Sequence, residues 1–584
     1  MRLSTLTITC VIAAIAVPTS ARAELGKVWA LDDGTKVKRS AIKHRLARRN
    51  GVFDGKAVHL FGARNEIVAF QLMLVGGKRA TRGVRVRFEA LGSIRNAAKL
   101  ASGRGDSADR WFIGRPIARF RQHYLTVRER SHDLTWKKRS RAMPRGMKGD
   151  IPDALIPLRR TDRFSVPARQ NQGVWIDVYI PKGTRAGRQR GTLVVEVGGK
   201  PCALSTCTLP VTLDVLDATL PDKPSAKTML YFGGGDDDRD YMMARYFKDP
   251  WKASAKQADA LRARHYKLAR RHRVTLILGK RKTPDRSLGQ RISGRAFTRA
   301  AGYEGPGARI GQDVYSIHTF GGKLTHKQAR VWSHYFAHRG PHVTYFLYTT
   351  DEPSPGQYRE VDAIARAARP VPAFVTTSFS PKLPAISIFC ALAESYRRAD
   401  ARRARAVRKH QWIYNGVRPF SGTFAIDDVA ISPRVNPWIQ YKHRIERWFY
   451  WESVYYKDFQ GKRGNIDVWR EPINFTNRHG DRMNGDGLLM YPGRDLVFKK
   501  HDRGFDMPLP SIRLKAWRRG IQDVEYLVLA TRRGHGAAVK RLLAKLLPRV
   551  LDQTRAGQAV SWPEDGERWL AARQRLFQLL ARRK

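Results

Sequence analysis

The first part of the chain carries short apolar and β-branched runs separated by Gly, Pro and Asn. Such runs, broken by turn residues, are typical of strands in antiparallel sheets. Because each sheet of this kind buries one face, we predict an antiparallel β-sandwich over residues 24–222, with a structural or sugar-binding role. The clearest strand-like runs are Ile67–Val75, Val84–Phe88, Gly173–Ile180, Gly191–Val197 and Pro210–Leu216.

The pattern changes after the linker Pro221-Asp222-Lys223-Pro224, where strand-like runs begin to alternate with segments of helical length. Repeated strand-helix units form parallel sheets, and eight such strands fit a TIM-type (β/α)₈ barrel, which we predict over residues 223–510. The predicted helices include Pro250–Arg271, Lys327–His338 and Gln357–Ala368. The predicted barrel strands are Thr228–Phe232, Val274–Leu278, Thr344–Tyr348, Ala373–Thr377, Ile386–Cys390, Gln411–Tyr414, Glu446–Trp451 and Gly487–Tyr491.

Beyond Pro510 the spacing of apolar residues becomes helical. Leu543, Leu546 and Leu547 recur near the 3.6-residue period of an amphipathic helix, and Pro548 should kink that helix or end it early. We therefore predict that residues 511–584 are helices packed on the barrel, at Ser511–Thr531, Ala537–Asp552 and Glu564–Arg583.

The stretch Thr344–Pro353 connects this pattern to chemistry. Its aromatic and β-branched run is typical of a buried strand, and the run stops at the adjacent carboxylates of Asp351 and Glu352. Spacing alone favours a helix start for this pair, since acidic residues often precede helices. At the C-terminal end of a barrel strand, however, the same pair would lie where catalytic groups are found, and we predict that both residues are catalytic.

Polar and aromatic residues also fall at or near the ends of other predicted strands. Aromatic rings stack on the apolar faces of sugars while polar groups bind hydroxyls, which suits a carbohydrate cleft. For any one of these residues alone, core packing is the competing interpretation. We predict substrate contacts for Tyr348, His318, Trp412, Tyr414, Asn415, Tyr450, Trp451 and Glu452.

No motif for nucleotide, zinc or serine-hydrolase chemistry accompanies these residues. The chain contains no Gly-x-x-x-x-Gly-Lys-Ser/Thr, no His-Glu-x-x-His and no Gly-x-Ser-x-Gly sequence. The acidic loop Gly233–Asp238 lacks the ligand spacing of an EF-hand. We therefore predict no metal site and no cofactor, and these absences favour carboxylate chemistry.

The N-terminus is typical of a secretory signal peptide. Arg2 is followed by the apolar run Leu6–Val17 and by small residues at Ala21 and Ala23, so we predict cleavage near Ala23 and a secreted or periplasmic protein. No later stretch approaches the roughly 20 apolar residues of a membrane span.

Three cysteines follow the predicted cleavage site. Cys202 and Cys207 flank a short segment and would either form a loop disulfide in an oxidising compartment or stay as two free thiols. Cys390 ends an apolar run, which favours a buried small hydrophobe over a nucleophile.

The charge is strongly unbalanced. Lys and Arg number 109 against 51 Asp and Glu, which leaves a formal net charge of +58. Such an excess favours polyanionic partners, but the basic residues are spread along the chain instead of being gathered in one segment. Export argues against nucleic acid as the partner. An acidic glycan is a hypothesis that rests on charge alone.

Several sequence blocks resemble glycoside hydrolase family 123 and the related bacterial domain of unknown function 4091, which include β-N-acetylgalactosaminidases. The resemblance runs from about Leu60 to Leu527. It rests on Ala63-Arg64-Asn65-Glu66, Asp351-Glu352-Pro353, Trp448-Phe449-Tyr450-Trp451, Gly485–Gly493, Leu509–Arg513 and Gly520–Tyr526.

The resemblance implies hydrolysis of β-linked 2-acetamido sugars by substrate assistance, with the family's Asp-Glu pair at Asp351 and Glu352. Adjacent carboxylates cannot easily flank a sugar as a nucleophile and an acid do. Asp351 would instead orient the acetamido group, and Glu352 would act as general acid and base. Glu452 stands where we expect relatives to carry Asn, so local substrate contacts should differ.

Two other classes of function compete with this one. The first is a carbohydrate-binding envelope protein that keeps the scaffold without turnover, and the second is a basic protein that binds polyanions. The intact Asp351-Glu352 pair favours the enzyme over the first alternative. Export and the scattered charge argue against the second.

Overall fold

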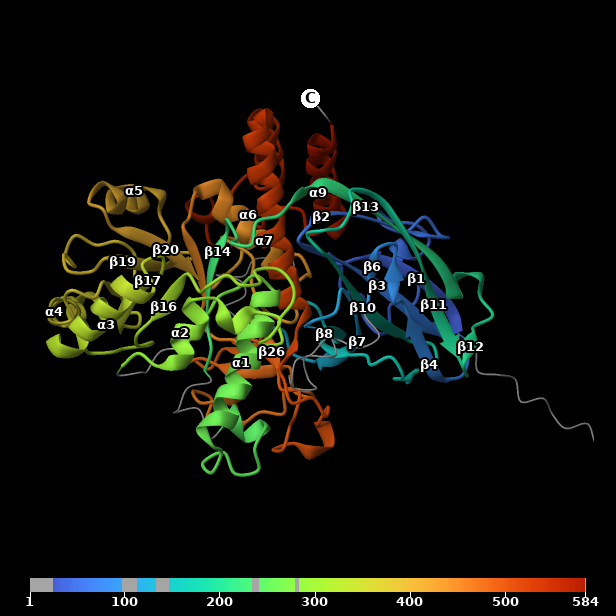
Figure 1. Ribbon diagram of the computed structural model, residues 1–584, viewed down its shortest axis with the longest axis horizontal. Coiled ribbons are helices and arrows are strands. Elements are labelled where there is room, and N and C mark those ends of the chain that lie inside the picture. The colour runs from blue at the N-terminus through green and yellow to red at the C-terminus, as the bar shows by residue number, and fades with distance from the viewer. Residues whose placement is uncertain (1–24, 97–112, 133–145, 234–240, 279–282, 583–584) are drawn as a thin grey trace, which may run out of the picture.

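A computed structural model describes residues 25–96, 113–132, 146–233, 241–278 and 283–582 (Figure 1). The predicted signal peptide and residues 234–238 of the acidic loop lie outside the described residues. Among the described helices, none combines the length and apolar character needed to cross a membrane.

Two sheets make up the N-terminal half and enclose one hydrophobic core. In spatial order, the first sheet is antiparallel and consists of β1 (Leu25–Asp32), β3 (Glu66–Gly76), β10 (Asn171–Ile180), β7 (Ile117–Val127) and β8 (Gly149–Pro157). The second runs in the order β2 (Val58–Arg64), β13 (Thr208–Thr219), β11 (Gly187–Val197), β4 (Thr81–Arg87) and β9 (Phe164–Val166). Its sixth strand, β12 (Lys200–Pro201), pairs with β11, and only the β2–β13 pair is parallel. We interpret these two sheets as the predicted sandwich.

The second half is built on an eight-stranded parallel sheet that curls into a nearly closed barrel. Its strands neighbour one another in chain order, and β21 pairs with β14. The remaining gap lies between β15 and β16, where the Gln312 side-chain amide donates to the Leu276 carbonyl at 2.8 Å. The strands are β14 (Lys227–Tyr231), β15 (Leu276–Ile277), β16 (Val314–Ser316), β17 (Thr344–Thr350), β18 (Ala373–Val375), β19 (Ile388–Leu392), β20 (His410–Tyr414) and β21 (Arg447–Tyr450).

Helices fill most of the connections between these strands, as the alternating pattern predicts. In chain order they are α1 (Ala255–Arg271), α2 (Arg286–Ile292), α3 (His326–Arg339), α4 (Tyr358–Ala367), α5 (Arg398–Ala406) and α6 (Ser432–His443). The start of α1 is set by a capping box in which Ser254 and Gln257 satisfy each other's backbone N–H groups. The same arrangement of Thr325 and Gln328 starts α3.

One predicted barrel strand is wrong. Gly487–Tyr491 lies outside the barrel, and its last two residues form β26 (Met490–Tyr491), which pairs antiparallel with β27 (Leu509–Pro510). The missing eighth strand is β16. Its three residues are too few to produce a clear apolar or alternating signal in the sequence.

Helix α7 (Ile512–Ala530) lies between the two halves instead of packing on the barrel alone (Figure 1). Lys515 and Arg518 of α7 both bind the buried carboxylate of Asp177 on β10. On the barrel side, α7 packs closely against α6 at Gly520. A Cβ at this glycine would lie only 2.4 Å from the Arg434 carbonyl oxygen, so the two helices meet where no side chain fits. The C-terminal helices therefore join the sheets to the barrel.

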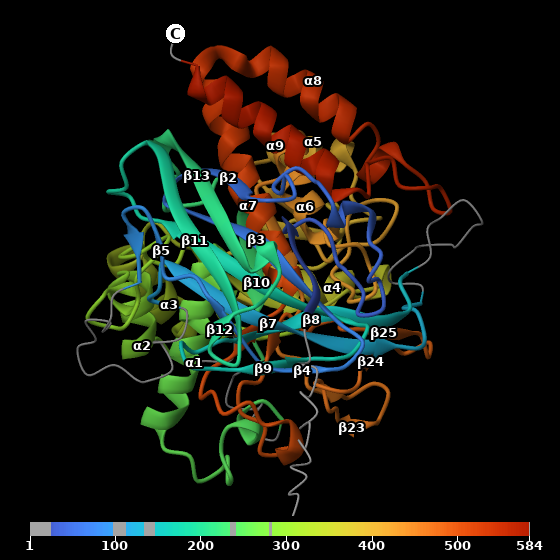
Figure 2. The same ribbon diagram turned by 90° about the vertical axis from the view of Figure 1, so that its right-hand side faces the viewer.

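Glu66 of β3 is the central acid of this interface and is fully buried. Its carboxylate accepts hydrogen bonds from Arg519 at 3.0 Å and from the Tyr526 hydroxyl at 2.7 Å, both on α7. It also binds Arg573 of α9 (Gly566–Ala581). Figure 2 shows α9 and α8 (Gly536–Leu546), which ends before Pro548 as predicted, at the same end of the molecule.

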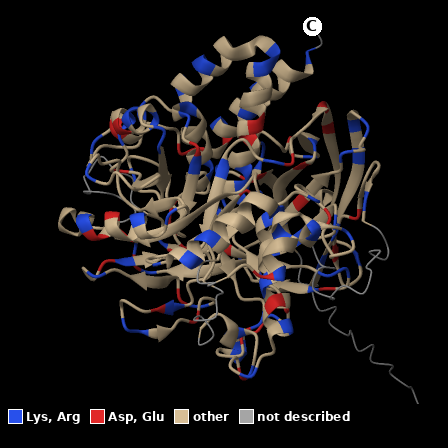
Figure 3. Ribbon diagram, turned by 60° about the vertical axis from the view of Figure 1, so that its left-hand side comes forward, with Lys and Arg blue, Asp and Glu red and all other residues tan. Residues whose placement is uncertain are grey.

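Buried ion pairs of this kind neutralise part of the positive charge of the chain. Figure 3 shows Lys and Arg distributed over both halves of the chain, without concentration in one element. Several arginines are buried against buried carboxylates, so their charge is balanced inside the protein: Arg245, Arg418, Arg434, Arg513, Arg518, Arg519 and Arg573.

We expect Glu66→Gln to destabilise the fold by about 3–5 kcal/mol, because it leaves Arg519 and Arg573 buried with less negative charge around them. The measurement is the midpoint of urea unfolding. Glu304→Gln is the matched control, since Glu304 forms an exposed ion pair with Arg299. Equal midpoints for the two variants would contradict the role given to Glu66.

Asp32, at the end of β1, predicts a pH dependence of stability. Burial, together with repulsion from Asp33 and Glu567, raises the pKa of Asp32 to about 7. The folded state therefore keeps the Asp32 proton up to about pH 7, whereas the unfolded state releases it near pH 4. The free energy of unfolding that comes from this bound proton is fully present below about pH 4 and is lost as the pH rises to about 7. Between pH 5 and 8, the wild type should lose on the order of 3 kcal/mol more unfolding free energy than Asp32→Asn. Parallel unfolding curves for the two proteins at both pH values would disprove this.

Candidate active site

Asp351 and Glu352 follow β17 directly and are exposed at the C-terminal rim of the barrel. The pairing of β17 with β18 shifts register between Tyr348 and Thr350. In a regular strand, residues three positions apart point to opposite faces, whereas a bulge re-aims the residues that follow it. As a result, the Asp351 carboxylate turns back to the Tyr348 hydroxyl, which donates a hydrogen bond to Asp351 Oδ1 at 2.5 Å.

Thr376, the residue after β18, holds both members of the pair. Its hydroxyl donates to Asp351 Oδ1 at 2.9 Å and accepts the backbone N–H of Glu352 at 2.7 Å. The backbone of Glu352 has a φ of 44°, a left-handed conformation that non-glycine residues adopt only when their surroundings impose it. The Thr376 bond to the Glu352 N–H helps to impose it here.

The Glu352 side chain reaches toward Tyr414, whose hydroxyl donates to Glu352 Oε1 at 2.5 Å. Tyr414 ends β20, three strands away from β17 in the barrel order. Glu352 therefore extends across the mouth of the barrel, while Asp351 stays beside its own strand.

The two tyrosines keep their protons at neutral pH. Burial raises the pKa of Tyr348 and of Tyr414 well above the usual value, and the adjacent carboxylates of Asp351 and Glu352 raise them further. Each carboxylate is thus fixed through one oxygen by a neutral donor. In the described part of the chain, neither Asp351 Oδ2 nor Glu352 Oε2 has a hydrogen-bond partner, so each is available to a ligand.

The structure places a second group of predicted residues at the ends of β20 and β21. The side-chain oxygen of Asn415 accepts the backbone N–H of Trp451 at 3.2 Å. Tyr450 and Trp451 donate to the two oxygens of Asp486 at 2.8 and 3.1 Å. Asp486 therefore fixes the two aromatic residues at the end of β21. His318 lies half-buried after β16, on the same rim.

Trp412 and Glu452, predicted as substrate contacts, are both buried. Trp412 is fully buried in the barrel interior, and its indole N–H donates to Glu446, which precedes β21 at the opposite end of the barrel. Glu452 is 2% exposed and accepts the backbone N–H groups of Gly233, Ser453 and Val454. Alternation along β20 points Trp412 and Tyr414 the same way, but only Tyr414 reaches the strand end.

The sequence reasoning missed Thr376 and Phe320. Thr376 is the second-last residue of the predicted strand Ala373–Thr377. Its position near a strand end was the available signal, but a threonine there is common. Phe320 lies in the loop after β16, the strand that the sequence pattern also missed. It is 38% exposed, and its ring lies 5.7 Å from that of Tyr348.

The cysteines take no part in this site. Cys202 and Cys207 are joined in a disulfide with their Cα atoms 5.6 Å apart. Cys390 is buried in the barrel interior, where burial raises the pKa of its thiol well above the usual value. A buried, protonated thiol is not a nucleophile.

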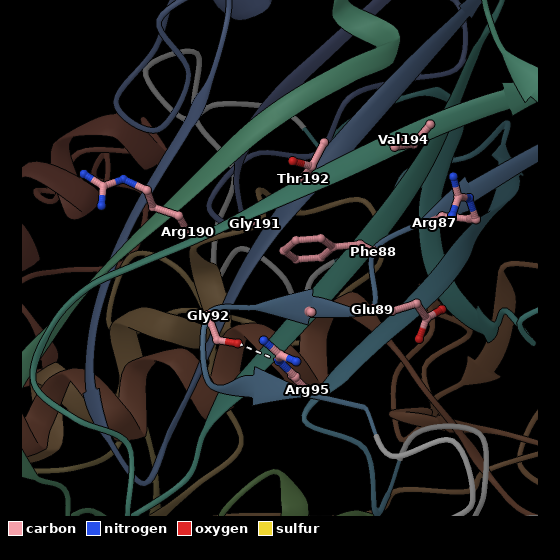
Figure 4. Close-up of a pocket in the computed structure, with 10 residues that line it drawn as sticks. Arg87, Phe88, Glu89, Gly92, Arg95, Arg190, Gly191, Thr192 and Val194 are labelled. Carbon is pink, nitrogen blue, oxygen red and sulfur yellow. Dashed lines mark hydrogen bonds between the residues drawn. The ribbon is translucent and has the colours of Figure 1, made fainter.

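The N-terminal half has a separate hollow of about 320 Å³ beside the short strands β5 (Ala90–Leu91) and β6 (Ile94–Arg95) (Figure 4). Arg95 donates to the Gly92 carbonyl at 3.0 Å, and Arg87 is paired with Glu196. Glu89 is the carboxylate of this hollow, and it is paired with Arg119. The hollow therefore holds no pair of unbound carboxylates like Asp351 and Glu352.

Comparison with solved structures identifies the fold. A family 123 glycoside hydrolase from Clostridium perfringens, studied for glycolipid glycan hydrolysis, superposes with a TM-score of 0.59 over 95% of this chain and 97% of that one, at 11% identity. The chain has the family 123 fold. The resemblance seen in the sequence blocks is thus confirmed at the level of the fold.

The other comparisons add no argument. Bacteroides thetaiotamicron EndoBT-3987 with Man5GlcNAc product aligns with 78% of this chain and 96% of that one at 9% identity, but its TM-score is only 0.17. No protein-family model and no curated protein sequence matches the chain. Because the family 123 likeness carries only 11% identity, it establishes the architecture alone, and the chemistry depends on the residues at the rim.

Proposed function

We propose that the protein is a glycoside hydrolase that cleaves a β-linked 2-acetamido sugar, of the N-acetylgalactosaminide type, by substrate-assisted hydrolysis with retention. The observation that carries this proposal is the pair Asp351 and Glu352. The two carboxylates are adjacent and exposed on one strand end of a family 123 fold, and among the described residues each is hydrogen-bonded through only one of its oxygens.

The arrangement differs from that of an ordinary retaining glycosidase, in which a carboxylate nucleophile faces the acid across the sugar at about 5 Å. Two other carboxylates near the end of β21 do not supply such a nucleophile. Glu452 is buried, with 2% of its surface exposed, and both oxygens of Asp486 are bound, by Tyr450 and Trp451. A substrate that brings its own nucleophile, the carbonyl oxygen of a 2-acetamido group, removes the need for one.

In the first step, Glu352 donates a proton to the glycosidic oxygen while the acetamido oxygen attacks the anomeric carbon and the bond to the leaving group breaks. Asp351 accepts a hydrogen bond from the acetamido N–H and stabilises the positive charge of the oxazolinium intermediate. In the second step, Glu352 takes a proton from water, whose oxygen opens the intermediate and restores the acetamido group with the original anomeric configuration.

The observed hydrogen bonds support this division of roles. Tyr348 and Thr376 both donate to Oδ1 of Asp351, which leaves Oδ2 for the acetamido N–H. Tyr414 binds Oε1 of Glu352, which leaves Oε2 to carry the transferred proton. Donors fixed before the substrate binds need no reorganisation during the reaction.

We also propose that the protein is exported. The signal-peptide pattern at the N-terminus supports this, and so does the Cys202–Cys207 disulfide, because such bonds persist in oxidising compartments. The positive charge is spread over the fold and partly neutralised inside it, so it gives no reason to prefer an acidic over a neutral glycan (Figure 3).

The first test is hydrolysis of aryl N-acetyl-β-galactosaminide and N-acetyl-β-glucosaminide beside the matching sugars that lack the acetamido group. We expect turnover only with the acetamido sugars, and we expect Glu352→Gln and Asp351→Asn each to lower kcat by about 100-fold or more. Glu304→Gln and Asp217→Asn make the same chemical changes at ion pairs away from the rim and should leave kcat unchanged.

Hydrolysis that ignores the acetamido group, or that survives Glu352→Gln, would overturn the mechanism. Binding of these sugars without any turnover would replace the enzyme by a carbohydrate-binding protein.

The second test concerns Thr376. Thr376→Val keeps the shape of the side chain but removes the bonds to Asp351 and to the Glu352 N–H, so both carboxylates lose a fixed position. We expect kcat to fall by about 10- to 100-fold with little change in KM. The control is Thr192→Val, since Thr192 is an exposed residue of β11. An unchanged kcat for Thr376→Val would show that Thr376 does not position the pair.

A further inference from the structure

Phe320 is a large apolar residue held at the mouth of the barrel. It follows β16 and is 38% exposed, whereas most aromatic residues of the described barrel are buried. Its ring meets that of Tyr231 edge-on, with centroids 4.7 Å apart, and lies tilted against that of Tyr348 at 5.7 Å. Tyr231 ends β14 and Tyr348 belongs to β17, so Phe320 spans the mouth between these two strands.

The loop around Phe320 is fixed to the strand that carries the catalytic pair. The backbone N–H of Gly322 donates to the Thr349 carbonyl of β17 at 3.2 Å. Gly322 also packs against the His318 side chain, which would lie only 2.3 Å from a Cβ added at this glycine. The loop therefore leaves no room for a larger residue at position 322.

The backbone of Phe320 is strained. Its φ is 59°, a left-handed conformation that costs a bulky residue about 1–2 kcal/mol. Strain of this kind persists where the surrounding structure imposes it, and it is most common at binding and catalytic sites. A phenylalanine that served only to fill the core would not need an exposed, strained position.

We propose that Phe320 is the aromatic platform for the sugar ring that carries the acetamido group, and that it packs on the apolar C–H face of that ring beside Asp351. This inference rests on the proposed function, since it concerns the same site. The Tyr348 hydroxyl is bound to Asp351, and the Tyr348 ring touches Phe320, so the platform and the acetamido-binding carboxylate share one support. Aromatic rings pack on apolar C–H surfaces, so the exposed part of the Phe320 ring suits the apolar face of a pyranose whose acetamido N–H binds Asp351.

The position of Phe320 separates its role from that of Glu352. Glu352 leans toward Tyr414 on β20, whereas Phe320 contacts Tyr231 and Tyr348. Phe320 should therefore contribute to sugar binding without taking part in proton transfer. A purely structural role would act differently: loss of the ring would loosen Tyr348 and Asp351 and lower kcat.

The experiment measures binding and turnover separately. Binding of methyl N-acetyl-β-galactosaminide and methyl N-acetyl-β-glucosaminide is measured by calorimetry in the Glu352→Gln background, with and without Phe320→Ala. Turnover of the aryl glycosides is measured with Phe320→Ala, Phe320→Leu and Phe320→Trp in the otherwise wild-type chain. Val407→Ala is the surface control, because Val407 is 55% exposed and follows α5.

We expect Phe320→Ala and Phe320→Leu to raise Kd and KM by about 3- to 10-fold with kcat within twofold, and Phe320→Trp to restore binding. The inference would be overturned if Phe320→Ala lowered kcat at unchanged KM, or if it left Kd unchanged. In either case, hydrolysis of the acetamido sugars by the wild type would leave the proposed function intact. Phe320-dependent binding without hydrolysis by the wild type would support the platform and reject the proposed reaction.

Discussion

The buried charge network around Glu66 is the interaction on which the rest of the structure depends. Glu66 of the sheets binds Arg519 of α7 and Arg573 of α9, and Arg573 continues to Asp523, which binds Arg434 of the barrel helix α6. Because each of these groups is buried, removing any one of them would strand an opposite charge. The sheets, α7 and the barrel are therefore held as one assembly.

This network explains why several of the sequence blocks that resemble family 123 lie in the joint between the halves. Glu66 and the Gly520–Tyr526 block meet in the interface, and Arg513 of the Leu509–Arg513 block binds Asp153 of β8. Buried charges need particular partners in particular positions, whereas apolar core residues can exchange for one another. The blocks that resemble family 123 thus mark the joint between the halves at least as much as the site.

The site depends on the barrel interior beneath it. Tyr348 and Tyr414 pack in the same core as Phe346, Phe374 and Trp412, and their hydroxyls emerge at the rim to hold Asp351 and Glu352. A rigid aromatic core therefore sets the positions of the two donors. The two carboxylates themselves remain exposed, as the proposed reaction requires.

The sequence by itself determined the alternation of strands and helices, the strand that ends at Asp351 and Glu352, and the end of α8 before Pro548, because apolar periodicity and proline act locally. Only the tertiary structure decided that Trp412 is core, that Glu452 binds backbone, and that Thr376 and Phe320 join the site. It also decided that α7 lies between the halves, although its block was already visible as a motif. Burial and cross-strand contacts depend on which strands become neighbours, and a short strand such as β16 leaves too little local pattern to reveal that in advance.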